Sequence, residues 1–381
     1  MNTKYAKIQI LSLTVLTVIL CALSSMSFAG AEWTQTADMP TARVAFSCSV
    51  VDGKIYAIGG KPGFTAKRFS IVEQYDPMTN EWTTKANMPT ARASLSTSVV
   101  DGKIYAFGGY TDGGPPKRIV EAYDPATDTW TRKTDMLIAE ADHSSAAVDG
   151  KIYVIGGDTV QIYDPLTNTW TKGADRPSTP RWWAPVGVVG GKIYSIGGAG
   201  GAPTWRVVST VETYDPATDT WTAKIDMPTA RASHAVAVVD GSIYVINGNG
   251  VTGTVFSVVE VYDPATDTWI EGPQPAIARM LSAASAVDGT IYLMGGFNQN
   301  VDTTFPFNTV EVLDLNPAVD FNVDGAVDID DLLILIESWD LDDPLVDIGP
   351  MPWGDGIVDA RDLLVLAEYM VEYANGVDDI Q

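Results

Sequence analysis

One ten-residue cassette recurs through this 381-residue sequence and constrains the fold more than any other feature. At residues 51–60 it reads Val-Asp-Gly-Lys-Ile-Tyr-Ala-Ile-Gly-Gly: a turn dipeptide, a short apolar run and a glycine pair. Asp-Gly between apolar runs is typical of a two-residue β-hairpin turn, because both turn residues adopt positive φ. The other copies occupy residues 101–109, 149–157, 190–198, 240–248 and 288–296.

The spacing of the copies indicates the architecture. The first glycine of each pair, or Asn247 in the fifth copy, lies at 59, 108, 156, 197, 247 and 295, so the repeat is 41 to 50 residues long. A repeat of this length with several short strands is typical of the blades of a β-propeller. Six copies predict six blades, each with four strands.

Two further signals recur within each repeat. Tyr-Asp follows the glycine pair at 75, 123, 163, 214 and 262, with Leu313-Asp314 in the sixth repeat, and Trp follows at 82, 130, 170, 221 and 269. The glycine pair, the tyrosine and the spaced tryptophan together resemble kelch repeats. The resemblance covers residues 31–316 and implies an all-β, six-bladed kelch propeller with four antiparallel strands per blade.

The sixth repeat has no Trp after Asp314, but Glu32-Trp33-Thr34 stands before the first repeat. This tripeptide matches Glu81-Trp82-Thr83, the fourth strand of the first repeat. We therefore expect the N-terminal strand to complete the last blade and close the ring, which removes the open edges of a linear array.

The N-terminus and the charge indicate an exported protein. Residues 1–29 have two lysines, an apolar run over 8–23 and Ser27-Phe28-Ala29, the pattern of a secretory signal peptide. Its removal leaves one cysteine, Cys48, and no membrane span. The net charge is −24, which argues against nucleic acid as a partner. We expect a secreted or cell-surface monomer.

The face that carries the start of each repeat is the expected ligand site. An arginine begins the first strand of five repeats, and Glu140 replaces it in the third. Guanidinium groups around one mouth can bind carboxylates or sugar hydroxyls. The alternative is structural: each arginine pairs with a local carboxylate or caps carbonyls. The arginines are Arg43, Arg92, Arg181, Arg231 and Arg279.

Residues that break the repeat are the other candidates. Trp182 and Trp183 follow Arg181 in the fourth repeat alone, and Trp205 lies in its long loop. Aromatic rings on a rim can stack on sugar faces, so these positions favour a carbohydrate ligand. The alternative is that they pack the long loops onto the ring.

The sequence shows no catalytic constellation. His143 and His234 are the only histidines, and their place inside a strand is typical of core residues. Sialate mutarotases of the bacterial periplasm also resemble six-bladed kelch propellers, and Glu140 among the arginines keeps that reading open. A glycoside hydrolase or lyase also stays open, because its paired carboxylates would come from separate strands.

The C-terminal segment carries a calcium-loop pattern. Residues 320–331 place side-chain oxygens at positions 1, 3, 5, 9 and 12, a glycine at position 6 and a backbone carbonyl at position 7. Calcium takes six to eight such hard oxygen ligands. The predicted ligands of this first loop are Asp320, Asn322, Asp324, Ala326, Asp328 and Asp331.

A second loop precedes a similar apolar helix pattern. It offers Asp355, Asp359 and Asp362, but Met351 and Trp353 occupy its first and third positions and lack side-chain oxygens. We therefore predict calcium in the first loop and leave the second open. Two loop-plus-helix units over residues 318–381 resemble a type I-like dockerin, which implies a cohesin-like scaffold partner. The resemblance implies partner-facing residues at Ile329, Asp330, Ala360 and Arg361.

These observations favour a secreted bacterial binding module. Its propeller would recognise a ligand, carbohydrate by preference, and its dockerin-like tail would attach it through calcium to an extracellular assembly that degrades polysaccharide. The alternative is a carbohydrate-active enzyme, either a hydrolase or lyase or a sialate mutarotase-like isomerase, with its site at the propeller mouth.

Overall fold

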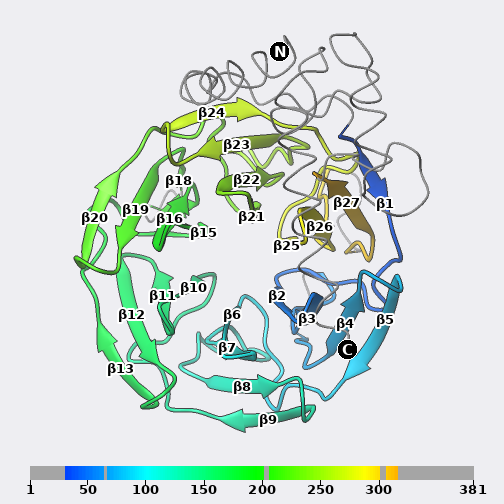
Figure 1. Cartoon of the computed structure of the whole chain (residues 1–381), viewed down its shortest axis with the longest axis vertical. Helices are drawn as coiled ribbons and strands as arrows, with labels where there is room; N and C mark the ends of the chain where they lie inside the picture. The colour runs from blue at the N-terminus through cyan, green and yellow to red at the C-terminus, as the bar shows by residue number, and fades with distance from the viewer. Residues whose placement is uncertain (1–30, 64–66, 201–205, 301–305, 316–381) are drawn as a thin grey trace, which may run out of the picture. The chain divides into compact units, whose positions relative to one another are not determined.

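The computed structural model describes residues 31–63, 67–200, 206–300 and 306–315 (Figure 1). The chain divides into two compact units, one of which is Glu32–Asp314; the other combines Met1–Ala31 with Leu315–Gln381. The fold below is that of Glu32–Asp314. The predicted signal peptide, Trp205 and the dockerin-like segment 318–381 lie outside the described residues.

The described residues form an all-β, propeller-like fold with six four-stranded antiparallel sheets. The first three sheets comprise β2 (Ser47–Val51), β3 (Lys54–Ile58), β4 (Val72–Asp76), β5 (Glu81–Lys85); β6 (Ser96–Val100), β7 (Lys103–Phe107), β8 (Val120–Asp124), β9 (Thr129–Arg132); and β10 (Ser144–Val148), β11 (Lys151–Gly156), β12 (Thr159–Asp164), β13 (Thr169–Lys172). The other three comprise β15 (Val186–Val189), β16 (Lys192–Ile196), β19 (Val211–Asp215), β20 (Thr220–Ala223); β21 (Ala235–Val239), β22 (Ser242–Ile246), β23 (Val259–Asp263), β24 (Thr268–Glu271); and β25 (Ala283–Val287), β26 (Thr290–Met294), β27 (Val310–Asp314), β1 (Trp33–Gln35).

Figure 1 shows the sheets of this unit around a common centre, with β2, β6, β10, β15, β21 and β25 innermost. Neighbouring sheets pack face to face through apolar clusters; Ile58 and Val72 of one sheet, for example, lie in the same cluster as Ile104 and Tyr123 of the next. A small three-stranded sheet is added in the fourth repeat by β14 (Arg181–Trp182), β17 (Ala199–Gly200) and β18 (Arg206–Val207). No helix of the described residues is long and apolar enough to cross a bilayer.

The predicted role of the N-terminal strand is confirmed. β1 pairs antiparallel with β27, with Trp33 opposite Leu313. The Trp33 indole N–H donates to the carbonyl of Pro273 at 2.8 Å, as the Trp82 indole does to Ala37 at 2.9 Å. The Trp82 bond joins the first sheet to the segment after β1 of the last sheet, and the Trp33 bond joins the last sheet to the segment after β24 of the fifth. The same contact therefore joins the first sheet to the last and the last to the fifth.

The repeated cassette folds as the sequence predicts. Asp52 and Gly53 have φ values of 48° and 66°, as a two-residue hairpin turn requires. The glycine pair links neighbouring repeats: the Gly60 N–H donates to the Arg92 carbonyl at 2.9 Å. A Cβ on Gly59 would lie 2.6 Å from that carbonyl oxygen, so a side chain there would force the two sheets apart.

A closed ring of backbone hydrogen bonds surrounds the centre of the six sheets, with one residue from each repeat. Each donates its N–H to the carbonyl of the preceding one at 2.7–3.2 Å, and the first donates to the last. All six have φ between 52° and 57°, a conformation that is uncommon for residues other than glycine. These ring residues are Ala45, Ser94, Asp142, Trp183, Ser233 and Leu281.

Each repeated arginine is buried and paired inside its own sheet. Arg92 is fully buried, donates to Glu121 at 2.8 Å, and caps the carbonyls of Gly108 and Ile119 at 2.8 and 3.1 Å. These contacts brace the segment before the first strand, the glycine loop and the third strand against one another. The corresponding pairs are Arg43–Glu73, Arg181–Glu212, Arg231–Glu260 and Arg279–Glu311.

The third repeat changes both partners of this pair. Glu140 replaces the arginine, and Gln161 replaces the glutamate of the third strand. The Gln161 side chain instead accepts a hydrogen bond from the Ile138 N–H at 2.8 Å. The double change removes the arginine and the glutamate together, so neither is left buried without the other.

His143 occupies a core position between neighbouring sheets. It is 7% exposed, and neither ring nitrogen has a hydrogen-bond partner within the described part of the chain. Leu95 takes the same place in the preceding repeat. Burial lowers the pKa of His143 to about 3, so the imidazole is neutral in the folded protein at physiological pH.

We predict that Arg92→Met lowers the free energy of unfolding by about 3–5 kcal/mol, because it leaves the Glu121 carboxylate buried without its partner. The double variant Arg92→Met/Glu121→Gln should lose less, as in the natural third repeat. Urea unfolding measures both. Lys103→Met, which breaks the exposed Lys103–Asp124 pair, serves as the control and should barely move the midpoint. If the single and double variants lose the same free energy of unfolding, the Arg92–Glu121 pair does not stabilise the sheet as described.

We predict that His143→Leu makes the protein less sensitive to mild acid. Unfolded histidine binds a proton below about pH 6.5, whereas the folded side chain does so only near pH 3. Protonation therefore favours the unfolded state, and stability falls as the pH drops. Between pH 6.5 and 5 the wild type should lose about 1.5 kcal/mol more than the variant. Urea midpoints are measured across this pH range for both proteins. If the midpoints of the wild type and of His143→Leu fall in parallel, the prediction is wrong.

Candidate functional site

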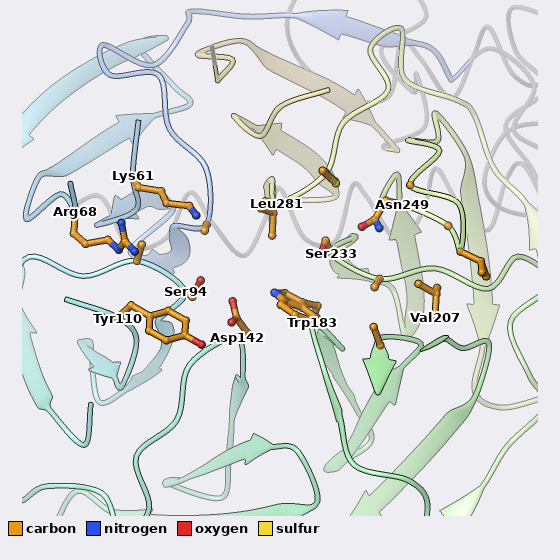
Figure 2. Close-up of a pocket in the computed structure, with 18 residues that line it drawn as sticks. Lys61, Arg68, Ser94, Tyr110, Asp142, Trp183, Val207, Ser233, Asn249 and Leu281 are labelled. Atoms are coloured by element: carbon orange, nitrogen blue, oxygen red, sulfur yellow. The ribbon is translucent and has the colours of Figure 1, made fainter. Parts of the chain in front are cut away.

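A central cavity of about 570 Å³ lies over the backbone ring (Figure 2). All six ring residues line it, and they stand two positions after the repeated arginine, or after Glu140 in the third repeat. Each residue of a second set of lining residues directly follows a glycine pair, or Asn247-Gly248 in the fifth repeat. It forms an antiparallel β-bridge with the residue that precedes the ring residue, as Lys61 does with Val44. This second set comprises Lys61, Tyr110, Ala199 and Asn249.

Asp142 is the acidic centre of the cavity. Its carboxylate accepts hydrogen bonds from the side chains of Ser94, Trp183 and Tyr110, and the Lys61 ammonium lies close enough to act on it electrostatically. Burial nevertheless raises the pKa of Asp142, because desolvation of the charged form outweighs these contacts. Figure 2 shows the Tyr110 hydroxyl pointing towards Asp142.

Trp183 is the large aromatic residue of the cavity. It is a ring residue with φ of 52°, a conformation that is strained for a bulky side chain. The residue is fixed at two points, since its backbone N–H donates to the Asp142 carbonyl at 2.9 Å and its side chain hydrogen-bonds to the Asp142 carboxylate. These two contacts hold the Trp183 indole in one orientation at the cavity wall before any ligand arrives.

The two sides of the cavity differ in polarity. Lys61 and Arg68 come from the first repeat and lie on the same side as Tyr110 (Figure 2). Burial and then the charge of Arg68 lower the pKa of Lys61. The opposite side is largely apolar and is contributed by the fourth to sixth repeats. It includes Ala199, Val207, Val251, Met280 and Leu281.

The structure brings together few of the site residues that the sequence suggested. Trp183 lines the cavity, whereas Trp182 lies outside it, and its side chain hydrogen-bonds to the Glu140 carboxylate. The Thr159 hydroxyl also donates to Glu140 at 3.4 Å, and burial raises the pKa of that carboxyl. Trp205 and all predicted calcium and partner-facing residues lie outside the described part of the chain.

The arginines form no ligand-binding ring at the mouth. Arg43, Arg92, Arg231 and Arg279 are fully buried and Arg181 is 3% exposed. Each guanidinium group already holds a glutamate of its own sheet, and none lines the cavity. The structural alternative left open by the sequence therefore describes them, and they act on the cavity only by holding its walls.

Sequence reasoning did not identify Lys61, Arg68, Ser94, Asp142 or Asn249 as site residues. A signal was present, because ring positions lie a constant two residues after the repeated arginine. Small residues occupy three of these positions, and Asp142, Trp183 and Leu281 occupy the other three. The ring position therefore varies, whereas the position two residues before it is arginine in five of the six repeats. Which side chains face the axis became clear only from the backbone ring.

The described residues present neither a clustered set of metal ligands nor a readily ionised thiol. They contain no group of three or more His, Cys, Asp and Glu side chains placed to hold a metal ion. Burial raises the pKa of the Cys48 thiol to about 11. The thiol is therefore unreactive at neutral pH, since the thiolate is the nucleophile and metal ligand.

Several kelch-like proteins are similar to part of this chain. Kelch-like protein 35 of Homo sapiens is 40% identical over 68 residues, 18% of this chain and 11% of that protein. Kelch-like protein terF of Aspergillus terreus is 45% identical over 69 residues, 17% of this chain and 15% of that protein. The chain thus matches less than a sixth of the length of these relatives.

A structural comparison extends the similarity to most of the propeller-like unit. The solved structure titled "Structure of YjhT" superposes with a TM-score of 0.62 over 72% of this chain and 96% of that one, at 15% sequence identity. That identity supports a shared fold alone. The family model "Attractin/LZTR1 beta-propeller" matches residues 55–304, well over half of the sequence. The chain therefore belongs to the Attractin/LZTR1 beta-propeller family, as a kelch-like β-propeller.

Proposed function

We propose that the protein is a secreted binding module that recognises carbohydrate in the central cavity. The observation that carries the proposal is Trp183, held at the wall of a cavity of about 570 Å³ by Asp142. A fixed aromatic face beside hydroxyl and amide groups suits a sugar ring, which has an apolar C–H face and polar edges. Ser94, Ser233 and Asn249 supply those polar groups.

Rigidity supports recognition at this position. Every wall residue contributed by the ring is fixed by two backbone hydrogen bonds, one donated and one accepted. A preformed site avoids the entropy cost of ordering loops upon binding. We further propose that the six described sheets are the complete set of blades of a closed six-bladed propeller, so that the cavity is its axial mouth.

The second candidate is a carbohydrate-active enzyme that uses the same cavity. The observation in its favour is Asp142, a carboxyl with a raised pKa next to the Tyr110 hydroxyl, because raised carboxyl pKa values are typical of general acids. Glycoside hydrolysis normally requires two carboxylates, and Asp142 is the only one among the described lining residues. Binding is therefore the preferred proposal.

The sequence of the tail supports a tether. We propose that residues 318–381 form a type I-like dockerin that binds calcium in its first loop and a cohesin-like domain of an extracellular scaffold. The ligand pattern Asp320, Asn322, Asp324, Asp328 and Asp331 carries this part of the proposal. Secretion follows from the signal-peptide pattern of residues 1–29. An assembly that degrades polysaccharide would use the propeller to hold its substrate.

We predict that Trp183→Ala weakens glycan binding by about 10-fold or more, because it removes the aromatic face from the cavity. A glycan array on the full chain identifies the ligand, and calorimetry with that ligand measures the loss. Trp182→Phe, outside the cavity, is the matched control and should bind as the wild type does. Full binding by Trp183→Ala would refute the cavity as the site, and release of reducing sugar would favour the enzyme.

We predict that the full chain, stripped with a chelator, binds calcium with a measurable heat. Asp320→Ala combined with Asp331→Ala should remove most of that heat, because the two residues supply the first and last ligands of the loop. Asp355→Ala in the incomplete second loop should have a smaller effect. A chain that shows no calcium-dependent heat would overturn the proposed dockerin-like tether and leave the cavity proposal intact.

A further inference from the structure

We propose that the ligand of the central cavity is a carboxylated glycan, one that contains a uronic acid, and that Lys61 and Arg68 bind its carboxylate. The inference rests on the proposed carbohydrate function and narrows its substrate class. It comes from the distribution of charge around the cavity, a feature independent of the Trp183 ring that carries the carbohydrate proposal.

The cavity carries positive charge on a strongly negative chain. Among its described lining residues, Lys61 and Arg68 carry positive charge and Asp142 carries negative charge. The whole sequence has a net charge of −24. Two cations at one wall of a recessed, partly desolvated site create a local field that attracts an anion in spite of the overall charge.

Asp142 offsets one of these two positive charges. Its carboxylate accepts hydrogen bonds from Ser94, Trp183 and Tyr110, which favour its charged form. The exposed Asp112 accepts a hydrogen bond from the backbone N–H of Arg68 at 2.7 Å, but it is not a lining residue. The Arg68 charge also lowers the pKa of Lys61, and a bound carboxylate would relieve that repulsion between like charges.

The apolar wall explains why the anion would belong to a sugar. Val207 and Leu281 face the cationic side across the cavity (Figure 2). A uronic acid has its carboxylate at one edge of the pyranose ring and C–H groups over the ring face. It can therefore place its charge at Lys61 and Arg68 while its C–H face contacts Trp183. A cavity of about 570 Å³ is within the range of small-molecule sites.

The test compares two ligands that differ only in charge. Oligogalacturonate and its fully methyl-esterified form share one sugar skeleton, and calorimetry on the full chain measures the binding of both. A panel of glucuronate and mannuronate oligomers, neutral oligosaccharides and an oligoglutamate peptide is run beside them. The acid form should bind about 10-fold or more tightly than its ester, and the difference should shrink as salt is added.

Variants assign the effect to the cations. Lys61→Gln and Arg68→Gln should each weaken binding of the preferred acidic oligomer about 10-fold and weaken binding of its neutral counterpart much less. Trp183→Ala should weaken both. Lys103→Gln, an exposed lysine paired with Asp124, is the matched control for loss of one positive charge. Urea midpoints check that each variant is folded.

The outcomes separate this inference from the proposed function. If neutral and acidic glycans bind equally and depend on Trp183, the carbohydrate proposal holds and the carboxylate inference is overturned. Preference for oligoglutamate over every uronate would overturn both in favour of an acidic peptide. Failure of every glycan to bind would also overturn both. Acid-selective binding that survives Lys61→Gln and Arg68→Gln would overturn the assigned residues.

Discussion

The closed ring of six backbone hydrogen bonds is the constraint from which the rest of this unit follows. It requires one residue of each repeat to adopt positive φ, at a cost of about 1–2 kcal/mol for a residue other than glycine. Trp183 and Leu281 adopt it despite their bulk. The ring compensates for this cost, because each residue gains a hydrogen-bonded N–H and carbonyl where no sheet supplies partners.

The repeated residues serve the ring and the variable ones serve the cavity. The glycine pair fixes where each repeat meets the next, through contacts such as Gly60–Arg92. The arginine–glutamate pair braces each repeat internally, through buried contacts such as Arg92–Glu121. Ring residues have their backbone fixed in the same way, but their side chains leave the scaffold and enter the cavity. Those positions can therefore vary without disturbing the fold, which leaves them available for recognition.

Asp142 connects scaffold and site. Through its backbone it belongs to the ring, as the ring residue of the third repeat. Through its carboxylate it orients Ser94 and Tyr110 of the second repeat and Trp183 of the fourth. A single side chain thus couples the positions of three cavity walls. Such mutual support among buried polar groups is what gives a binding site a defined shape before its ligand arrives.

The sequence by itself determined the local structure. Its Asp-Gly turns, glycine pairs and Trp33 predicted the hairpins, the repeats and the pairing of β1 with β27, because each depends on contacts that recur at fixed spacing. Only the tertiary structure decided which side chains meet at the centre. The arginines proved to be buried because their glutamate partners lie about 30 residues away on the third strand. Lys61 and Asp142 became neighbours because the backbone hydrogen bonds of the six described repeats form a ring, which brings together residues that no local pattern relates.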